Sequence, residues 1–127
     1  IMTRPKLIGI APQLIVPDVV QTAEYYRDVL GFEIIGYFLD PPVYAMVKRD
    51  EFQIHFGKAD ADFEINKNAY YKKGCTDLII WVPEIDAFYE ELRSRNAIIF
   101  QEITKRVYGS REFIIQDCNG YLITVGD

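Results

Sequence analysis

The stretch IAPQLIVPDVVQTAEYYRDVLGF, residues 10–32, decides the fold of this chain. It combines an apolar run, a Pro-Asp corner in which Asp18 can cap a helix, an amphipathic segment and a glycine stop. The same plan returns 66 positions later in TDLIIWVPEIDAFYEELRSRNAI, residues 76–98, where Glu84 takes the place of Asp18. Because an internal repeat fixes the architecture before any motif is weighed, the two copies predict a pair of related half-domains.

Three further strand-like runs follow each copy, so the order β-α-β-β-β is expected twice. In the first half we expect a helix after Asp18 and strands over 7–16, 32–39, 43–48 and 52–56. In the second half we expect a helix over 84–95 and strands over 76–82, 98–103, 111–116 and 121–125. The predicted fold class is α+β, with two helices covering one side of an eight-stranded open mixed sheet.

Length and composition indicate one globular domain. With 127 residues, 50% of them apolar and 26% charged, the chain is long enough for a real core and has an ordinary composition. We expect a single domain over 1–127, with half-modules 7–57 and 75–127 joined by a polar linker over 58–74. No apolar run approaches the roughly 20 residues that span a bilayer, so no membrane partner is expected.

Charge and cysteine content indicate which classes of partner and which cellular compartment to expect. The formal net charge is −5 and there is no block of basic residues, so nucleic acid is not an expected partner. The first residues, IMTRPKL, lack the long apolar segment of a signal peptide. Cys75 and Cys118 are the only cysteines and have no metal or redox spacing, so we expect two free thiols in a reducing cytoplasm.

Alternation along the strands separates two faces of the predicted sheet. One set of positions, such as Leu14 and Ile54, is purely apolar, as a surface that packs against helices must be. The other set mixes aromatic, apolar and polar side chains, such as Gln13, His55 and Trp81. This second face could be a solvated surface, a structural interface or a partly enclosed small-molecule pocket. Large apolar groups such as Trp81 are poor choices for a wet surface and favour the pocket.

Several motifs in combination carry a family resemblance. The opening LIVPDVVQTAEYYRDVLGFEI, its repeat at 76–98 and the ending YGSREFIIQDCNGYLITVGD resemble the vicinal oxygen chelate superfamily over nearly the whole chain. This superfamily includes glyoxalase I, bleomycin-resistance proteins, fosfomycin-resistance enzymes and extradiol dioxygenases. The resemblance implies that each half curls into an open sheet and that the two halves enclose a cavity on the concave side.

The resemblance also implies four ligand positions for a catalytic metal, two in each half. In this chain they are Ala11, His55, Asp77 and Thr124. Ala11 has no ligand atom and Thr124 is a poor ligand, which leaves fewer than the three protein ligands of catalytic zinc sites. We therefore expect no cofactor, with a divalent ion held by His55 and Asp77, near Gln13, as the alternative. His55, the only histidine, is the natural acid or base if the site performs chemistry.

These departures point toward the metal-free, bleomycin-resistance-like branch, which sequesters a ligand without transforming it. For that branch the resemblance implies a homodimer with ligand grooves between subunits, beside the segment that matches Tyr108, Gly109, Arg111 and Glu112. Arg111 and Glu112 can equally form a surface ion pair. The expected ligand-binding residues are Gln13, Phe38, Tyr44, His55, Asp77, Trp81, Tyr108 and Arg111.

The leading hypothesis is a dimeric, cytoplasmic, metal-independent protein that binds a planar or aromatic small molecule, with Trp81 as the main stacking surface. Asp77 and the net charge of −5 favour a cationic or neutral ligand, and an antibiotic-resistance role is a narrower form of the hypothesis. No catalytic residue is assigned. One alternative is a metal-dependent lyase, isomerase or dioxygenase of the same superfamily that uses His55, Asp77 and a third group such as Gln13. Another is a regulatory module that binds a partner.

Overall fold

The computed structural model describes residues 3–62 and 64–127, and its elements repeat the order β-α-β-β-β. The first half contains β1 (Gln13–Val16), α1 (Val19–Asp28), β2 (Glu33–Phe38), β3 (Tyr44–Arg49) and β4 (Phe52–Lys58). The short α2 (Asn68–Tyr71) lies between the halves, and the second half contains β5 (Leu78–Trp81), α3 (Ile85–Ser94), β6 (Ile98–Lys105), β7 (Arg111–Gln116) and β8 (Leu122–Gly126). The predicted pair of repeats is confirmed. Among the described residues, no helix has the length and apolar character needed to cross a membrane.

The strands form two four-stranded sheets, in the orders β1-β4-β3-β2 and β5-β8-β7-β6. β1 runs parallel to β4 and β5 runs parallel to β8, while the other neighbours are antiparallel, so each sheet is mixed as predicted. The eight predicted strands are thus divided between two sheets rather than joined in one. The reason is that both sheets turn their helix sides toward one shared core, which sets them across from each other instead of edge to edge.

Local signals set both ends of α1 and the end of α3. Asp18 accepts a hydrogen bond of 3.0 Å from the backbone N–H of Gln21, which is the contact expected of an aspartate N-cap. Gly31 follows α1 with φ +77°, and Asn96 follows α3 with φ 63°, so the predicted left-handed residues are confirmed. The two helix-bearing segments therefore form where the sequence repeat places them.

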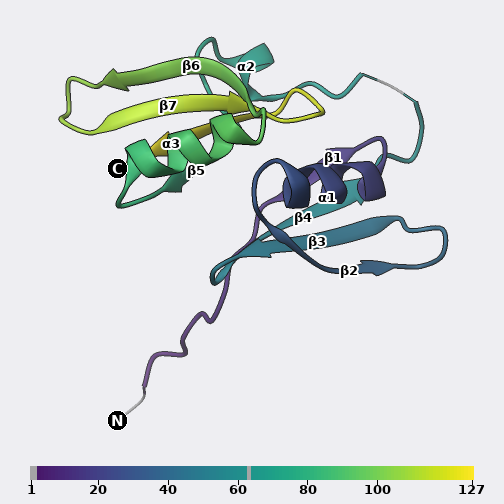
Figure 1. The fold of residues 1–127 in the computed structure, drawn as a ribbon. Helices are drawn as coiled ribbons and strands as arrows, with labels where there is room; N and C mark the ends of the chain where they lie inside the picture. Colours follow the sequence, from purple (N-terminus) through teal and green to yellow (C-terminus); the bar gives the residue numbers. More distant parts are fainter. Residues whose placement is uncertain (1–2, 63) are drawn as a thin grey trace.

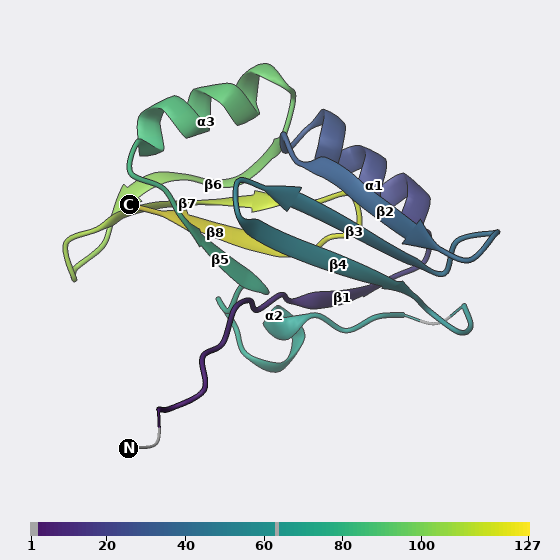
Figure 2. The ribbon, with the colours of Figure 1, turned by 90° about the horizontal axis from the view of Figure 1, so that it is seen from below.

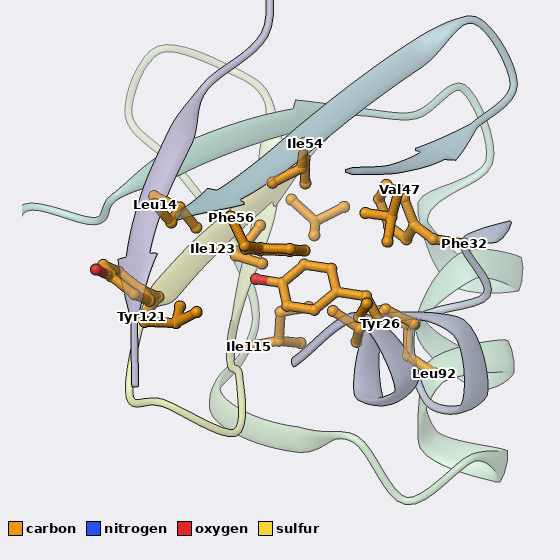
Figure 3. Packing of buried hydrophobic residues seen from close by; sticks show 14 of the residues in the cluster. Leu14, Tyr26, Phe32, Val47, Ile54, Phe56, Leu92, Ile115, Tyr121 and Ile123 are labelled. Carbon is orange, nitrogen blue, oxygen red and sulfur yellow. The ribbon is translucent and has the colours of Figure 1, made fainter. Parts of the chain in front are cut away.

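One hydrophobic core holds the two halves together (Figure 3). From α1, Tyr26 contributes a ring whose centre lies 4.8 Å from that of Phe56 on β4. Leu92 from α3 and Ile115 from β7 belong to the same cluster, so both helices and both sheets share it. The Tyr26 hydroxyl also donates a hydrogen bond of 2.6 Å to Asp117, in the turn between β7 and β8.

The helix-free faces of the sheets point away from this core. Figure 1 shows α1 and α3 between the two sheets. Most of the positions predicted to pack against helices are buried, including Leu14, Val16, Ile54, Phe56, Ile123 and Val125. Ile10 and Phe52, assigned to the same side, are instead 90% and 74% exposed. A single chain therefore presents a separate open face on each sheet, in place of one cavity enclosed between its halves.

The predicted strand over 7–16 is too long, because β1 covers only Gln13–Val16. The contact with β4 begins where His55 N–H donates to the Pro12 oxygen at 3.0 Å, and Pro12 has no N–H to extend the ladder. Residues 3–12 form an extended arm that leads away from the body (Figure 2). The apolar side chains of this arm are bare: Leu7 is 91% exposed, Ile8 101% and Ile10 90%.

Candidate functional site

The residues predicted to bind a ligand fall into two groups on two sheets. Those of the first half are Gln13, Phe38, Tyr44 and His55, which lie on β1 to β4. Those of the second half are Asp77, Trp81, Tyr108 and Arg111, in or beside β5 and β7. Because the helix-free faces of the two sheets are separate, the structure does not bring these residues together around one pocket in a single chain.

A chain of hydrogen bonds crosses the first sheet from β1 to β4. Gln13 Nε2 donates to the Tyr44 hydroxyl at 2.6 Å, and that hydroxyl lies 2.8 Å from His55 Nδ1. The other ring nitrogen, His55 Nε2, lies 2.8 Å from Gln53 Oε1. Strand register explains the meeting, because Gln13 lies opposite His55 and Gln53 precedes His55 by two residues on the same face.

Apolar side chains lie on the same face as this polar chain. Ile15 on β1 is 44% exposed and Phe38 on β2 is 59% exposed. Met46 on β3 lies opposite His55 in the antiparallel pair of β3 and β4. The first face therefore combines an oriented polar strip with apolar surface that solvent can reach.

The second sheet carries an open groove with a volume of about 940 Å³. Its apolar lining includes Ile79 and Trp81 on β5, with Val107 and Tyr108 in the loop between β6 and β7. Trp81 is 71% exposed, Tyr108 68% and Ile79 50%, so aromatic and aliphatic surface faces solvent here. Of the positions that strand alternation assigns to the mixed face, Asp77, Ile79, Trp81 and Thr124 line this groove, and loop residues complete it.

Polar contacts inside the groove centre on Glu112. Its carboxylate accepts a hydrogen bond of 2.6 Å from the Tyr108 hydroxyl and forms an ion pair with Arg106 at 3.0 Å. The hydrogen bond to Glu112 raises the pKa of the Tyr108 hydroxyl, because ionisation would remove the donated proton. Tyr108 is thus held as a neutral, oriented phenol on the groove wall.

Two of the predicted polar residues have structural partners. Asp77 lines the groove, but its two carboxylate oxygens accept the backbone N–H groups of Asn68 at 2.9 Å and Leu122 at 2.8 Å. Arg111 is not part of the groove lining and forms a surface ion pair with Asp86 at 3.1 Å. Asp77 therefore fixes the starts of α2 and β8. Arg111 does form a surface ion pair, as the alternative interpretation expected, but its partner is Asp86 rather than Glu112.

The four positions at which the resemblance implies metal ligands do not fit a metal. Ala11 has no donor atom, and both ring nitrogens of His55 have hydrogen-bond partners. Both oxygens of Asp77 are bound by backbone N–H groups, and the Thr124 hydroxyl lies 2.7 Å from that of Thr76. Across residues 3–62 and 64–127, no three or more His, Cys, Asp or Glu side chains are grouped closely enough to hold an ion.

Two residues of these surfaces were not among the predicted binding residues. Gln53 completes the hydrogen-bonded chain, and its spacing of two from His55 on a strand was the available signal. Val107, 105% exposed, projects from the loop between β6 and β7, where no periodic pattern exists to place a side chain.

Comparison with known proteins gives a consistent picture. The model of the Glyoxalase/Bleomycin resistance protein/Dioxygenase superfamily matches residues 9–125. TioX from Micromonospora sp. ML1 superposes with a TM-score of 0.74 at 16% identity, covering 93% of this chain and 96% of TioX. A glyoxalase-related enzyme from Clostridium phytofermentans gives a TM-score of 0.75 at 16% identity, covering 96% and 95%.

A further similar structure is the bleomycin-binding protein from bleomycin-producing Streptomyces verticillus, complexed with copper(II)-bleomycin. Its TM-score is 0.70 at 21% identity, and the match covers 96% of this chain and 97% of that protein. No curated protein sequence matches the chain. At these identities the solved structures share the fold, and the site must be interpreted from this chain's own residues.

Proposed function

The chain belongs to the glyoxalase/bleomycin resistance protein/dioxygenase superfamily, and from this premise we propose that it binds and sequesters a planar or aromatic small molecule without a metal. The observation that carries the proposal is Trp81, 71% exposed on the wall of the groove. A flat indole offers a large stacking area at low entropic cost. The groove volume of about 940 Å³ lies in the range of about 300–1,000 Å³ typical of small-molecule sites.

The proposed functional form is a homodimer with each ligand groove between subunits. A single chain leaves apolar side chains exposed on both helix-free faces and on the arm, and surfaces of this kind mark interaction sites. A second copy would set the first sheet of one chain against the second sheet of the other. The predicted residues of the first sheet would then face the same ligand as the groove residues Trp81 and Tyr108, which a single chain does not achieve.

A neutral or cationic ligand fits the charge of the chain. The formal net charge is −5, which disfavours an anion. The groove lining itself is balanced, with the carboxylates of Asp77 and Glu112 and the cations Lys105 and Arg106, so it suits a neutral ligand best. The bleomycin-binding protein of Streptomyces verticillus supports small-molecule binding as one use of this fold, and an antibiotic-like ligand is the narrower form of the proposal. The two free cysteines support a reducing, cytoplasmic setting.

Ligand binding at Trp81 is tested by a thermal-shift screen of planar aromatic compounds, followed by calorimetric titration of the compounds that bind. We expect Trp81→Ala to weaken binding about tenfold, because it removes the stacking surface. Phe52→Ala is the matched control, since Phe52 is an aromatic residue 74% exposed outside the groove lining. Equal affinity in the wild type and Trp81→Ala would contradict the proposal.

Metal analysis separates sequestration from the alternative of a metal-dependent lyase, isomerase or dioxygenase. In protein purified without chelator we expect far less than one metal per chain, because the donors of His55 and Asp77 are already bound to other groups. His55→Ala should leave this content unchanged. Stoichiometric metal that disappears in His55→Ala would replace the proposal with the enzymatic alternative.

A further inference from the structure

The hydrogen-bonded chain on the first sheet has a defined direction. Gln53 Oε1 can only accept, so the proton of the His55 ring must be on Nε2. A neutral imidazole then accepts at Nδ1, and the Tyr44 hydroxyl donates its proton to His55. At the other end Gln13 Nε2 can only donate, and it does so to the Tyr44 oxygen. The two ends of the chain therefore require the same direction.

This direction decides what the face can offer to a ligand. The only proton of the Tyr44 hydroxyl is committed to His55, so the remaining capacity of its oxygen is as an acceptor. The exposed side chain of Gln13, whose Nε2 donates to Tyr44, carries a second acceptor in its Oε1. No residue of the described chain donates to that oxygen. Two neighbouring acceptors select a ligand group that donates a hydrogen bond.

The surroundings of these acceptors suit an aromatic ring. Ile15 and Phe38 are 44% and 59% exposed on the same sheet, which leaves apolar surface for a ring to cover. The cation Lys48, opposite Gln53, is paired with Glu33 at 3.6 Å. A neutral ring carrying one hydrogen-bond donor would thus find both an apolar and a polar partner here.

We propose that the chain Gln13–Tyr44–His55–Gln53 recognises the phenolic hydroxyl of an aromatic ligand. This inference rests on the proposed function and narrows its ligand from any planar molecule to one that carries a hydroxyl donor. The ligand hydroxyl donates to the Tyr44 oxygen. His55 is a positioning residue that holds the Tyr44 proton away from the ligand, and Gln53 holds the tautomer of His55. A hydrogen-bonded chain thus occupies the position where the family resemblance implies a metal ligand.

The direction of the chain can be observed without any ligand, because His55 is the only histidine. Nitrogen-15 NMR of the imidazole distinguishes the two neutral tautomers directly. At a pH where the ring is neutral, we expect the proton on Nε2 and an unprotonated Nδ1. A proton on Nδ1 would overturn the proposal, because Tyr44 would then be free to donate toward the ligand.

The recognition itself is tested by titration calorimetry with 2-naphthol and its methyl ether, 2-methoxynaphthalene, which differ only in the donor. We expect the wild type to bind 2-naphthol about tenfold more tightly, the worth of one well-placed hydrogen bond. Tyr44→Phe should bind the two probes equally, through a loss of affinity for 2-naphthol. Tyr37→Phe is the matched control, because Tyr37 lies on the same sheet and outside the hydrogen-bonded chain, and it should keep the preference.

The outcomes separate this inference from the proposed function. Equal affinity of the wild type for both probes, or a preference that survives Tyr44→Phe, would overturn recognition of the hydroxyl. If binding of either probe still weakens in Trp81→Ala, the proposed sequestering function stands even where recognition of the hydroxyl has been overturned. Failure of both probes to bind would overturn recognition of the hydroxyl, while the proposed function is decided separately by the screen of planar compounds and by Trp81→Ala.

Discussion

The hydrogen bond from the Tyr26 hydroxyl to the Asp117 carboxylate links the two halves inside the core. Asp117 is 1% exposed, and its carboxylate accepts hydrogen bonds from the Tyr26 hydroxyl and from the backbone N–H groups of Asn119 and Tyr121. Burial raises the pKa of Asp117, while these donors favour its ionised form. A buried carboxyl that depends on three donors makes the loss of any one of them costly.

We expect Tyr26→Phe to lower the free energy of unfolding by about 1–3 kcal/mol, because Asp117 would lose a buried hydrogen-bond donor. Urea denaturation followed by circular dichroism measures the change. Tyr25→Phe is the matched control on the neighbouring residue, since the buried Tyr25 hydroxyl has no hydrogen-bond partner in the described structure. Its stability should be unchanged or slightly higher, and an equal loss in both variants would contradict the role given to the Tyr26 hydroxyl.

Single residues also show what the sequence can predict of the candidate site. His55, Tyr44 and Gln13 fall on the helix-free face because a strand alternates its sides, which one sequence reveals. Asp77 has the charged side chain expected of a ligand-binding residue, yet its two carboxylate oxygens accept hydrogen bonds from the backbone N–H groups of Asn68 and Leu122. Contacts of that kind depend on tertiary placement, which no local pattern contains.

At the scale of elements, an ion pair joins β3 to α3 across the two halves. Arg49 and Glu91 form two parallel contacts, 2.6 Å from Nη1 to Oε2 and 2.8 Å from Nη2 to Oε1. Arg49 also donates to the Leu30 oxygen at 3.0 Å and lies over the Phe88 ring, 4.8 Å from its centre. Both partners are about a third exposed, so solvent screening keeps the contribution of the pair modest.

The hydrogen bond from Arg49 lowers the pKa of the Glu91 carboxyl below its ordinary value of 4.5. The pair therefore stabilises the fold fully above that ordinary value, and the contribution is lost as the pH falls through the lowered one. We expect Glu91→Gln to cost about 1 kcal/mol at pH 7 and the difference from wild type to shrink on acidification. Urea titrations at pH 7 and at a pH below the lowered pKa of Glu91 measure the difference in the free energy of unfolding. Glu24→Gln, which removes a more exposed 3.9 Å pair with Arg27, is the control and should change little.

Elements also show where prediction from the sequence succeeds and fails. Helix ends carry local signals, so Asp18 and Gly31 placed α1 correctly and Asn96 placed the end of α3. The length of β1 depends on its partner strand, because β4 pairs with this segment only over Gln13–Val16. The apolar run over 7–12 precedes these paired residues, so it predicts a longer strand than the structure has. Division of the strands between two sheets is likewise decided by how the halves pack, which repeats alone do not specify.

At the scale of the whole molecule, the bare arm predicts assembly. Leu7, Ile8 and Ile10 are at least 90% exposed in a single chain, which is an unusual concentration of apolar surface for one extended segment. We expect a homodimer in sedimentation velocity. The triple change Leu7→Ser, Ile8→Ser and Ile10→Ser should weaken it about tenfold or more without loss of folding, because the arm contributes nothing to the chain's own core.

The control for the arm is the double change Ile35→Ser and Phe100→Ser, which removes exposed apolar side chains from the edge strands β2 and β6. This variant should remain dimeric at the same protein concentration. A wild-type chain that sediments as a monomer would contradict the predicted assembly, and so would an arm variant that dimerises as strongly as the wild type.

Trp81 is the only tryptophan of the chain and stands 71% exposed, which gives the protein an unusual optical property. Its emission in the isolated chain should already resemble that of an indole in water, so denaturation will shift the emission maximum very little. Covering the groove has the opposite effect, because an indole moved out of water emits at shorter wavelength. In the isolated chain intrinsic fluorescence therefore reports whether a ligand or a second copy covers the groove, rather than folding, and it does so without any added label.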